Sequence, residues 1–378
     1  MKTNNDRKMF AFENLYDDGE YYWFTVWSYN ALFRMDKKNW LAEYMGSFSN
    51  AKLSEGRLYE QIIEYDNKLY FTPGLAKSIG VYDKKSGNFS NIDYSVLQSD
   101  KTEGAIEMDF YSASKYNGCI YFFPHQKDYI LKLEVKTGKI MRIPFLNDDI
   151  QANSIGVTWF FGICVQNNTV YAPFNGVNAV LKLDMSNDEI TVYEVGEPGM
   201  GFADICFDGE NFWLAPMHGG VIVRWNDKQN ISEKIELNIK GNTDFLFCRC
   251  EYFNDRIYLI PNTYDKMLTI ETQNNNNYCV NEYIDVGDTD KGIYYSNYIC
   301  CNSVNDHILL LDKDLYLSEI DKENKTDRYE QVKLNPDNEN KYNLFISKLQ
   351  SELFYDTEQT NFESSVFPLK DYIKSIIK

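Results

Sequence analysis

The chain has 378 residues, with 56 acidic and 38 basic side chains, three histidines and a formal net charge of −18. This charge repels phosphate backbones and anionic membrane surfaces, so we expect neither a nucleic acid nor a membrane as partner. The first twenty residues lack the apolar segment of a signal peptide, and no apolar run approaches the roughly 20 residues of a membrane-spanning helix. We therefore expect a cytoplasmic protein.

Eight cysteines are spread along the chain, and none forms the CxxC pair used by zinc or thioredoxin-like sites. They are Cys119, Cys164, Cys206, Cys248, Cys250, Cys279, Cys300 and Cys301. Free cysteine is commonly a small buried hydrophobe, so we expect reduced thiols. The alternative is that a close pair of cysteines is redox-active or binds a metal. The candidate pairs are Cys248 with Cys250 and Cys300 with Cys301.

A short apolar motif recurs along the chain and often ends in proline. Its copies are "NKLYFTP" from 67, "GCIYFFP" from 118, "NTVYAP" from 168, "NFWLAP" from 211 and "DRIYLIP" from 255. An anchor residue can be assigned to seven units, 42 to 51 residues apart: Trp23, Tyr70, Tyr121, Tyr171, Trp213, Tyr258 and Ile308. A period of this length indicates a repeat architecture.

A second landmark supports the alignment, because an acidic residue ends an apolar run thirteen residues after most anchors. These residues are Asp36, Asp83, Glu134, Asp184, Glu271 and Asp321, with Asn226 at this offset in the fifth unit. Turn residues separate four short strands in each unit, which predicts an all-β, seven-bladed β-propeller of four-stranded antiparallel blades over residues 10–335. Six blades and a separate terminal domain are the alternative, because the seventh unit lacks the aromatic anchor and the proline.

The unit "DGENFWLAP", residues 208–216, resembles repeats of the NHL and virginiamycin B lyase kind, in which a "DGxLWF" hairpin recurs in every blade. The resemblance covers about residues 10–333 and implies a propeller fold. For lyases of this kind it also implies histidine and glutamate side chains that act with a divalent metal at one mouth of the channel and eliminate across an ester bond. No surrounding motif carries individual catalytic residues over to this chain.

Residues eleven positions before the anchors are mostly aromatic. They are Phe12, Tyr59, Phe110, Phe160, Phe202, Phe247 and Asn297. The first strand of a propeller blade is innermost, so these residues should lie near one end of the central channel. Two interpretations remain: rings that fill the wedges between blades, or a ring of aromatic platforms for a ligand. In the second, the binding residues are Phe110, Phe160, Phe202 and Phe247.

Residues nine positions before the anchors change in polarity from blade to blade. They are Asn14, Gln61, Ser112, Gly162, Asp204, Arg249 and Ile299. Asp204 and Arg249 would either pair with each other or bind a ligand, because arginine suits bidentate recognition of carboxylates. Glu60, which precedes Gln61, extends this polar lining, and both are candidate ligand-binding residues.

Two of the three histidines follow the proline that ends the repeated motif, His125 in blade three and His218 in blade five. Both should lie in the loop between the second and third strands, on the face that carries the aromatic column, and we predict that they contact ligand. A metal site built from these histidines with Glu60 or Asp204 is the alternative. His307 is expected to be a hairpin residue.

The last segment, residues 336–378, has a different pattern. Leu349 and Leu353 follow Phe345 at four-residue steps, and Leu369, Ile373 and Ile377 repeat this spacing, which predicts two short amphipathic helices. They would either brace the propeller or serve as a handle for a partner.

These patterns together favour a monomeric binding propeller that engages a protein, peptide or glycan through the loop face at its channel mouth. No cofactor is evident. The competing hypothesis is an enzyme, a lyase or hydrolase that uses the mouth histidines and carboxylates, with a divalent metal in that case. Neither P-loop, GxGxxG, GxSxG nor HExxH occurs in a fitting context, so the sequence assigns no catalytic residue.

Overall fold

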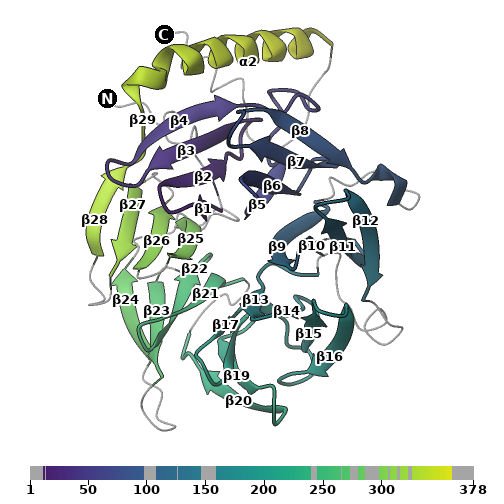
Figure 1. Ribbon diagram of the computed structural model, residues 1–378. Coiled ribbons are helices and arrows are strands. Elements are labelled where there is room, and N and C mark those ends of the chain that lie inside the picture. Colours follow the sequence, from purple (N-terminus) through teal and green to yellow (C-terminus); the bar gives the residue numbers. More distant parts are fainter. Residues whose placement is uncertain are drawn as a thin grey trace.

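The computed structural model describes residues 12, 14–97, 108–125, 127–145, 159–239, 245–264, 266–272, 280–285, 298–304, 307–312, 316–321 and 326–359. Within these ranges the chain forms seven antiparallel sheets arranged around a ring, as Figure 1 shows. Six sheets have four strands, and the first has a fifth strand at its outer edge. The predicted seven-bladed β-propeller is confirmed, and the six-bladed alternative is not what forms.

Each blade is a continuous stretch of sequence. Blade one contains β1 (Tyr16–Asp17), β2 (Tyr21–Thr25), β3 (Leu32–Asp36) and β4 (Leu41–Gly46). Blade two contains β5 (Tyr59–Tyr65), β6 (Lys68–Pro73), β7 (Ser78–Asp83) and β8 (Phe89–Asp93), followed by the 3₁₀ turn η2 (Ser95–Leu97). Blade three contains β9 (Phe110–Tyr116), β10 (Cys119–Pro124), β11 (Tyr129–Glu134) and β12 (Lys139–Pro144).

The next four blades follow the same order. Blade four contains β13 (Cys164–Gln166), β14 (Thr169–Pro173), β15 (Ala179–Asp184) and β16 (Glu189–Glu194). Blade five contains β17 (Phe202–Phe207), β18 (Phe212–Pro216), β19 (Val221–Asn226) and β20 (Ile231–Glu236). Blade six contains β21 (Phe247–Phe253), β22 (Arg256–Pro261), β23 (Lys266–Glu271) and β24 (Val280–Asp285). Blade seven contains β25 (Tyr298–Val304), β26 (His307–Asp312), β27 (Tyr316–Ile320) and β28 (Thr326–Gln331).

The two sequence landmarks coincide with the register of the blades. In five blades the acidic residue lies opposite the residue two positions before the anchor, in the pairs Tyr21↔Asp36, Lys68↔Asp83, Cys119↔Glu134, Thr169↔Asp184 and Arg256↔Glu271. The acid also shapes the following turn, since Asp83 Oδ1 accepts hydrogen bonds from the backbone N–H groups of Lys85 and Ser86, both at 2.9 Å. Turn formation therefore explains why a short acidic residue recurs at this position.

The "DGE" turns of blades one and five use one aspartate for three hydrogen bonds. In blade five, Asp208 Oδ1 accepts from the backbone N–H groups of Glu210 and Asn211 at 2.8 and 2.7 Å, and Oδ2 accepts from Trp213 Nε1 at 2.7 Å. Asp18 makes the equivalent bonds in blade one. The aspartate thus ties the hairpin to the tryptophan anchor of its blade.

Replacing Asp208 by alanine is expected to lower the free energy of unfolding by about 1–3 kcal/mol, because three donors lose their acceptor. Equilibrium unfolding in urea measures this loss. Glu210→Ala is the control, since Glu210 is exposed in the same turn and its removal should change stability by less than about 0.5 kcal/mol. Equal losses in the two variants would contradict this role of Asp208.

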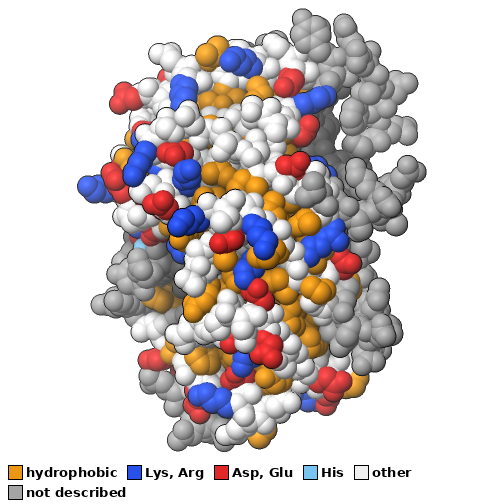
Figure 2. Space-filling model, turned by 45° about the vertical axis from the view of Figure 1, so that its right-hand side comes forward, with side chains coloured by type: hydrophobic (Ala, Val, Ile, Leu, Met, Phe, Trp, Pro, Cys, Tyr) orange, Lys and Arg blue, Asp and Glu red, His pale blue; other side chains and the backbone are white. Residues whose placement is uncertain are grey.

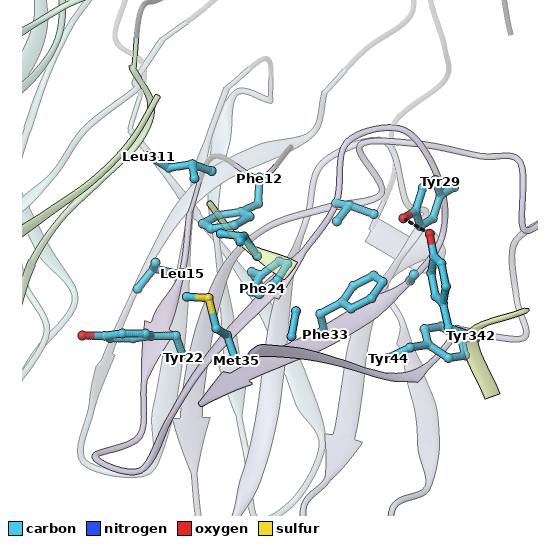
Figure 3. Close-up of a cluster of buried hydrophobic side chains, with 14 of the residues drawn as sticks. Phe12, Leu15, Tyr22, Phe24, Tyr29, Phe33, Met35, Tyr44, Leu311 and Tyr342 are labelled. Carbon is cyan, nitrogen blue, oxygen red and sulfur yellow. Dashed lines mark hydrogen bonds between the residues drawn. The ribbon is translucent and has the colours of Figure 1, made fainter. Parts of the chain in front are cut away.

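The hydrophobic core is divided among the gaps between neighbouring blades, each of which holds its own buried cluster. The cluster at the ring closure joins blades one and seven and the C-terminal segment, and Figure 3 shows part of it. Leu309, Leu311 and Leu317 of blade seven pack there against blade one. Tyr22 Oη lies 3.2 Å from Nε2 of His307, the first residue of β26, so a polar contact also crosses this seam.

The segment after blade seven returns to blade one. β29 (Lys333–Leu334) pairs in parallel with β4, and after the 3₁₀ turn η3 (Pro336–Asn338) the helix α2 (Glu339–Gln359) lies along the outer side of blade one (Figure 1). This helix contains the first predicted tail helix. The second, within residues 364–378, lies outside the described residues. No helix in the described ranges is long and apolar enough to cross a membrane.

Candidate functional site

A cavity of about 510 Å³ lies in the central channel, lined by the inner strands of the blades. Six of the seven residues in the column nine positions before the anchors line it: Asn14, Gln61, Ser112, Gly162, Asp204 and Arg249. The remaining lining residues are Ile163, Cys164, Val165, Gln166, Ile205, Cys206, Phe207, Cys250, Glu251 and Tyr252. The column whose polarity changes from blade to blade is therefore the polar wall of the channel.

Several of these polar side chains also connect neighbouring blades. Gln61 Oε1 of blade two accepts a hydrogen bond from the backbone N–H of Ala113 in blade three at 2.6 Å. Ser112 of blade three donates from Oγ to the carbonyl oxygen of Phe161, next to blade four, at 2.7 Å. The innermost strands have no further strand beside them, so these side chains satisfy backbone groups that face the channel.

The same arrangement continues on the other side of the ring. Asp204 Oδ2 of blade five accepts from the backbone N–H of Cys250 in blade six at 2.9 Å, and Arg249 Nη2 donates to Asn14 Oδ1, before blade one, at 3.0 Å. Blade four contributes Gly162 instead of a side chain, and a Cβ at this position would collide with the carboxylate of Asp204. The glycine therefore makes room for the aspartate of the next blade.

Two carboxyl groups face the cavity with raised pKa values. Burial raises the pKa of Asp204 to about 6, against the opposing effects of the Arg249 charge and the backbone N–H groups of Cys250 and Ile205. Burial and the nearby Asp204 raise the pKa of Glu251 to about 8, although Arg249 lowers it. Glu251 is thus held largely protonated at neutral pH although it lines a cavity.

Sequence reasoning missed Glu251. It occupies the column seven positions before the anchors, which also contains Cys164 and Cys206. An acidic residue among these small side chains is the signal that identifies a second ionisable group in the channel.

The channel cysteines form a buried group beside the carboxylates. Cys206 Sγ lies 3.1 Å from Cys250 Sγ, and both thiols are free and buried. Burial raises the pKa of both, and it raises the pKa of Cys164 to about 12. Because the thiolate is the reactive form, these cysteines are poor nucleophiles and ligands in this environment.

Neither predicted mouth histidine lines the cavity. His125 is buried, with Nδ1 3.3 Å from the carbonyl oxygen of Phe160, and its ring packs against Tyr111 and Phe161 at centroid distances of 5.7 and 4.9 Å. Phe161 in turn stacks on Phe245 at 5.3 Å. We call Tyr111, His125, Phe161 and Phe245 the aromatic cluster. It lies where the inner strands begin, whereas the cavity extends toward the hairpins where these strands end.

The other predicted residues are distributed differently. His218 is exposed in the loop after β18. Glu60 is buried, and the Nε of Arg57 lies 3.6 Å from its Oε1. Four predicted rings are fully buried between blades and have no exposed face to offer a ligand, as the packing interpretation expects: Phe110, Phe160, Phe202 and Phe247. In the described ranges no group of three or more His, Cys, Asp or Glu side chains is arranged to hold a metal ion.

Comparison with solved structures supports the fold. A virginiamycin B lyase from Staphylococcus aureus superposes with a TM-score of 0.59 at 14% identity, over 81% of this chain and 92% of that one. A streptogramin B lyase gives 0.57 at 16% identity, over 81% and 92% of the two chains. The extracellular domain of a putative one-component system from B. thetaiotaomicron gives 0.59 at 16% identity, over 85% of this chain and 42% of that one.

These likenesses confirm the resemblance to β-propeller proteins predicted from the repeats. At such identities they establish the fold and nothing finer. No protein-family model matches the chain, and no curated protein matches its sequence.

Proposed function

We propose that the protein is a binding propeller whose ligand site is the cavity in the central channel. The carrying observation is that six of the seven residues of the most variable polar column converge on one cavity of about 510 Å³. A volume of this size suits a small molecule. Acidic, basic and apolar side chains are interspersed on the face in Figure 2, so no single charged area of that face competes with the channel as a candidate.

The exposed loop around His218 stays a predicted contact for a larger partner, such as a protein, peptide or glycan. It lies apart from the residues that line the cavity.

A second candidate function is enzymatic, as a lyase or hydrolase. It is supported by Asp204 and Glu251, because carboxyl groups with pKa values of about 6 and 8 are suited to proton transfer at neutral pH. Product formation from a bound ligand, lost in Glu251→Gln, would favour this candidate over binding alone.

Filling the cavity tests its role. Val165 lines the cavity and is 42% exposed, so Val165→Trp would place an indole in the cavity from its rim without removing a core side chain. We expect at least about a tenfold loss of affinity for any small ligand that binds the unmodified protein, since one tenfold step costs only about 1.4 kcal/mol. Ligand-observed NMR with a set of small polar compounds measures it.

Ile231→Trp is the matched control, because Ile231 is 60% exposed on the outer strand β20. It should bind every compound as the unmodified protein does. If Val165→Trp also binds them all unchanged, the ligand site lies outside the channel.

A further inference from the structure

The cavity is lined by more acidic than basic side chains. Among its described lining residues, Asp204 and Glu251 carry carboxyl groups and Arg249 carries the one guanidinium. The other titratable groups that face them are the thiols of Cys164, Cys206 and Cys250 and the phenol of Tyr252, and burial raises the pKa of each of these as well. With both carboxyl groups ionised, the described wall would carry one net negative charge.

The charge of Arg249 lowers the pKa of both acids, and Arg249 has other partners as well. Its Nη2 donates to Asn14 Oδ1 at 3.0 Å, and its guanidinium carbon lies 5.7 Å from the ring centroid of Tyr111. Asp204 uses Oδ2 for the backbone N–H of Cys250. Proton retention on Glu251 is therefore how the protein alone limits the cost of two neighbouring buried carboxylates.

Three apolar or aromatic residues line the cavity near its hairpin end, where Gln166 also lies. Val165, Phe207 and Tyr252 line the cavity near the hairpin ends of β13, β17 and β21. Val165 is well exposed, and the other two are partly exposed, so this end faces solvent. A ligand from this side would meet these partly exposed residues first and the buried Asp204 at greater depth.

We propose that the cavity binds a small organic cation, with its ammonium or guanidinium group at Asp204 and Glu251 and its apolar part against Val165, Phe207 and Tyr252. The assignment rests on the proposed function, since it names the ligand class of the same site. A cation beside carboxylates forms charge-assisted hydrogen bonds, and Val165, Phe207 and Tyr252 offer apolar surface to the rest of the ligand.

Binding would expel a proton. A positive charge near Glu251 favours its ionised form and lowers its raised pKa, so the carboxyl group that is protonated in the free protein ionises in the complex. With a pKa of about 8 before binding, close to one proton should leave for each cation bound at neutral pH. This release separates a cation at Glu251 from one that adheres elsewhere on an acidic protein.

Three probes of matched shape test the proposal: phenethylamine as a cation, 2-phenylethanol as its neutral counterpart and phenylacetate as an anion. Isothermal titration calorimetry gives affinities, and a pH-stat in unbuffered salt solution counts protons. We expect phenethylamine to bind at least about tenfold more tightly than either other probe, since one charge-assisted hydrogen bond contributes about 1.5–3 kcal/mol.

Glu251→Gln keeps the shape of the side chain and removes its charge. It should weaken phenethylamine binding at least about tenfold and abolish proton release, because a neutral amide cannot ionise. Glu194→Gln is the control with the same change of charge on the exposed outer strand β16, and it should alter neither quantity. Loss of phenethylamine binding in Val165→Trp locates the probe in the cavity.

Each contrary result has one meaning. If 2-phenylethanol or phenylacetate binds as tightly as phenethylamine and is lost in Val165→Trp, the channel is a ligand site but the cation assignment is wrong. If phenethylamine does not bind, or Mg²⁺ displaces it at equimolar concentration, the organic-cation assignment is also wrong. If Val165→Trp alters the binding of no ligand, the proposed function fails together with it.

Discussion

Replacing Phe345 by alanine is expected to lower the free energy of unfolding by about 3–5 kcal/mol, the range for a buried phenylalanine. Phe345 is 3% exposed, and its ring lies 4.6 Å from Tyr44 and 5.3 Å from Tyr29 between centroids. The lost ring would leave a void in the cluster that holds α2 against blade one. Thermal and urea unfolding measure the change.

Leu344→Ala is the matched control for this prediction. Leu344 is the neighbouring residue of the same helix and is 60% exposed, so its truncation should cost less than about 0.5 kcal/mol. Similar losses in both variants would mean that the burial of the Phe345 ring is not what holds α2 against blade one.

The contribution of α2 to stability follows from the way the ring of blades closes. The strands β1 to β4 of blade one and β25 to β28 of blade seven each come from one stretch of chain, so neither set of four strands combines both ends of the sequence. The seam relies instead on side-chain packing, on the pairing of β29 with β4, and on α2. Tyr342 of α2 packs in this cluster, and its hydroxyl group lies 3.3 Å from that of Tyr29 (Figure 3).

The repeats predicted the fold because each blade must satisfy the same local rules. Trp213 lies in the second strand of its blade and is held by Asp208, five residues earlier in the chain. Asp184 ends the third strand of its blade and lies opposite Thr169 of the adjacent strand. Local rules of this kind leave a regular spacing in the sequence. The tail was less predictable from its four-residue spacing. Tyr342 is also buried on α2, but it lies three residues before Phe345 and therefore outside that spacing.

The candidate site was predicted only in part, for a physical reason. Gln61, Asp204 and Arg249 were found because their column lines the channel in six of the seven units, and the repeat fixes that direction. The position of His125 depends on Phe161 and Tyr111, whose rings come from separate blades and enclose it. Packing between blades produces no regular spacing in the sequence. The sequence therefore predicted the loops that carry the histidines, but it did not predict that neither histidine lines the cavity.

The pH dependence of stability is expected to change when Glu251 becomes glutamine. The pKa of Glu251 is raised from 4.5 to about 8 in the folded protein, so the folded state holds a proton that the unfolded state has lost between these values. Ionisation therefore disfavours folding, and the penalty grows as the pH rises from 4.5 and is complete above about 8. Glutamine is neutral throughout and escapes this penalty.

Glu251→Gln should therefore melt at a higher temperature than the unmodified protein, by roughly 5 °C at pH about 8.5, and the gap should narrow as the pH falls toward about 5. Differential scanning calorimetry across this pH range measures the difference in melting temperature and its dependence on pH. Glu194→Gln, which removes an exposed carboxylate, should follow the unmodified protein at every pH. A gap that stays constant with pH would show that the amide stabilises through packing or hydrogen bonding and not through the missing charge.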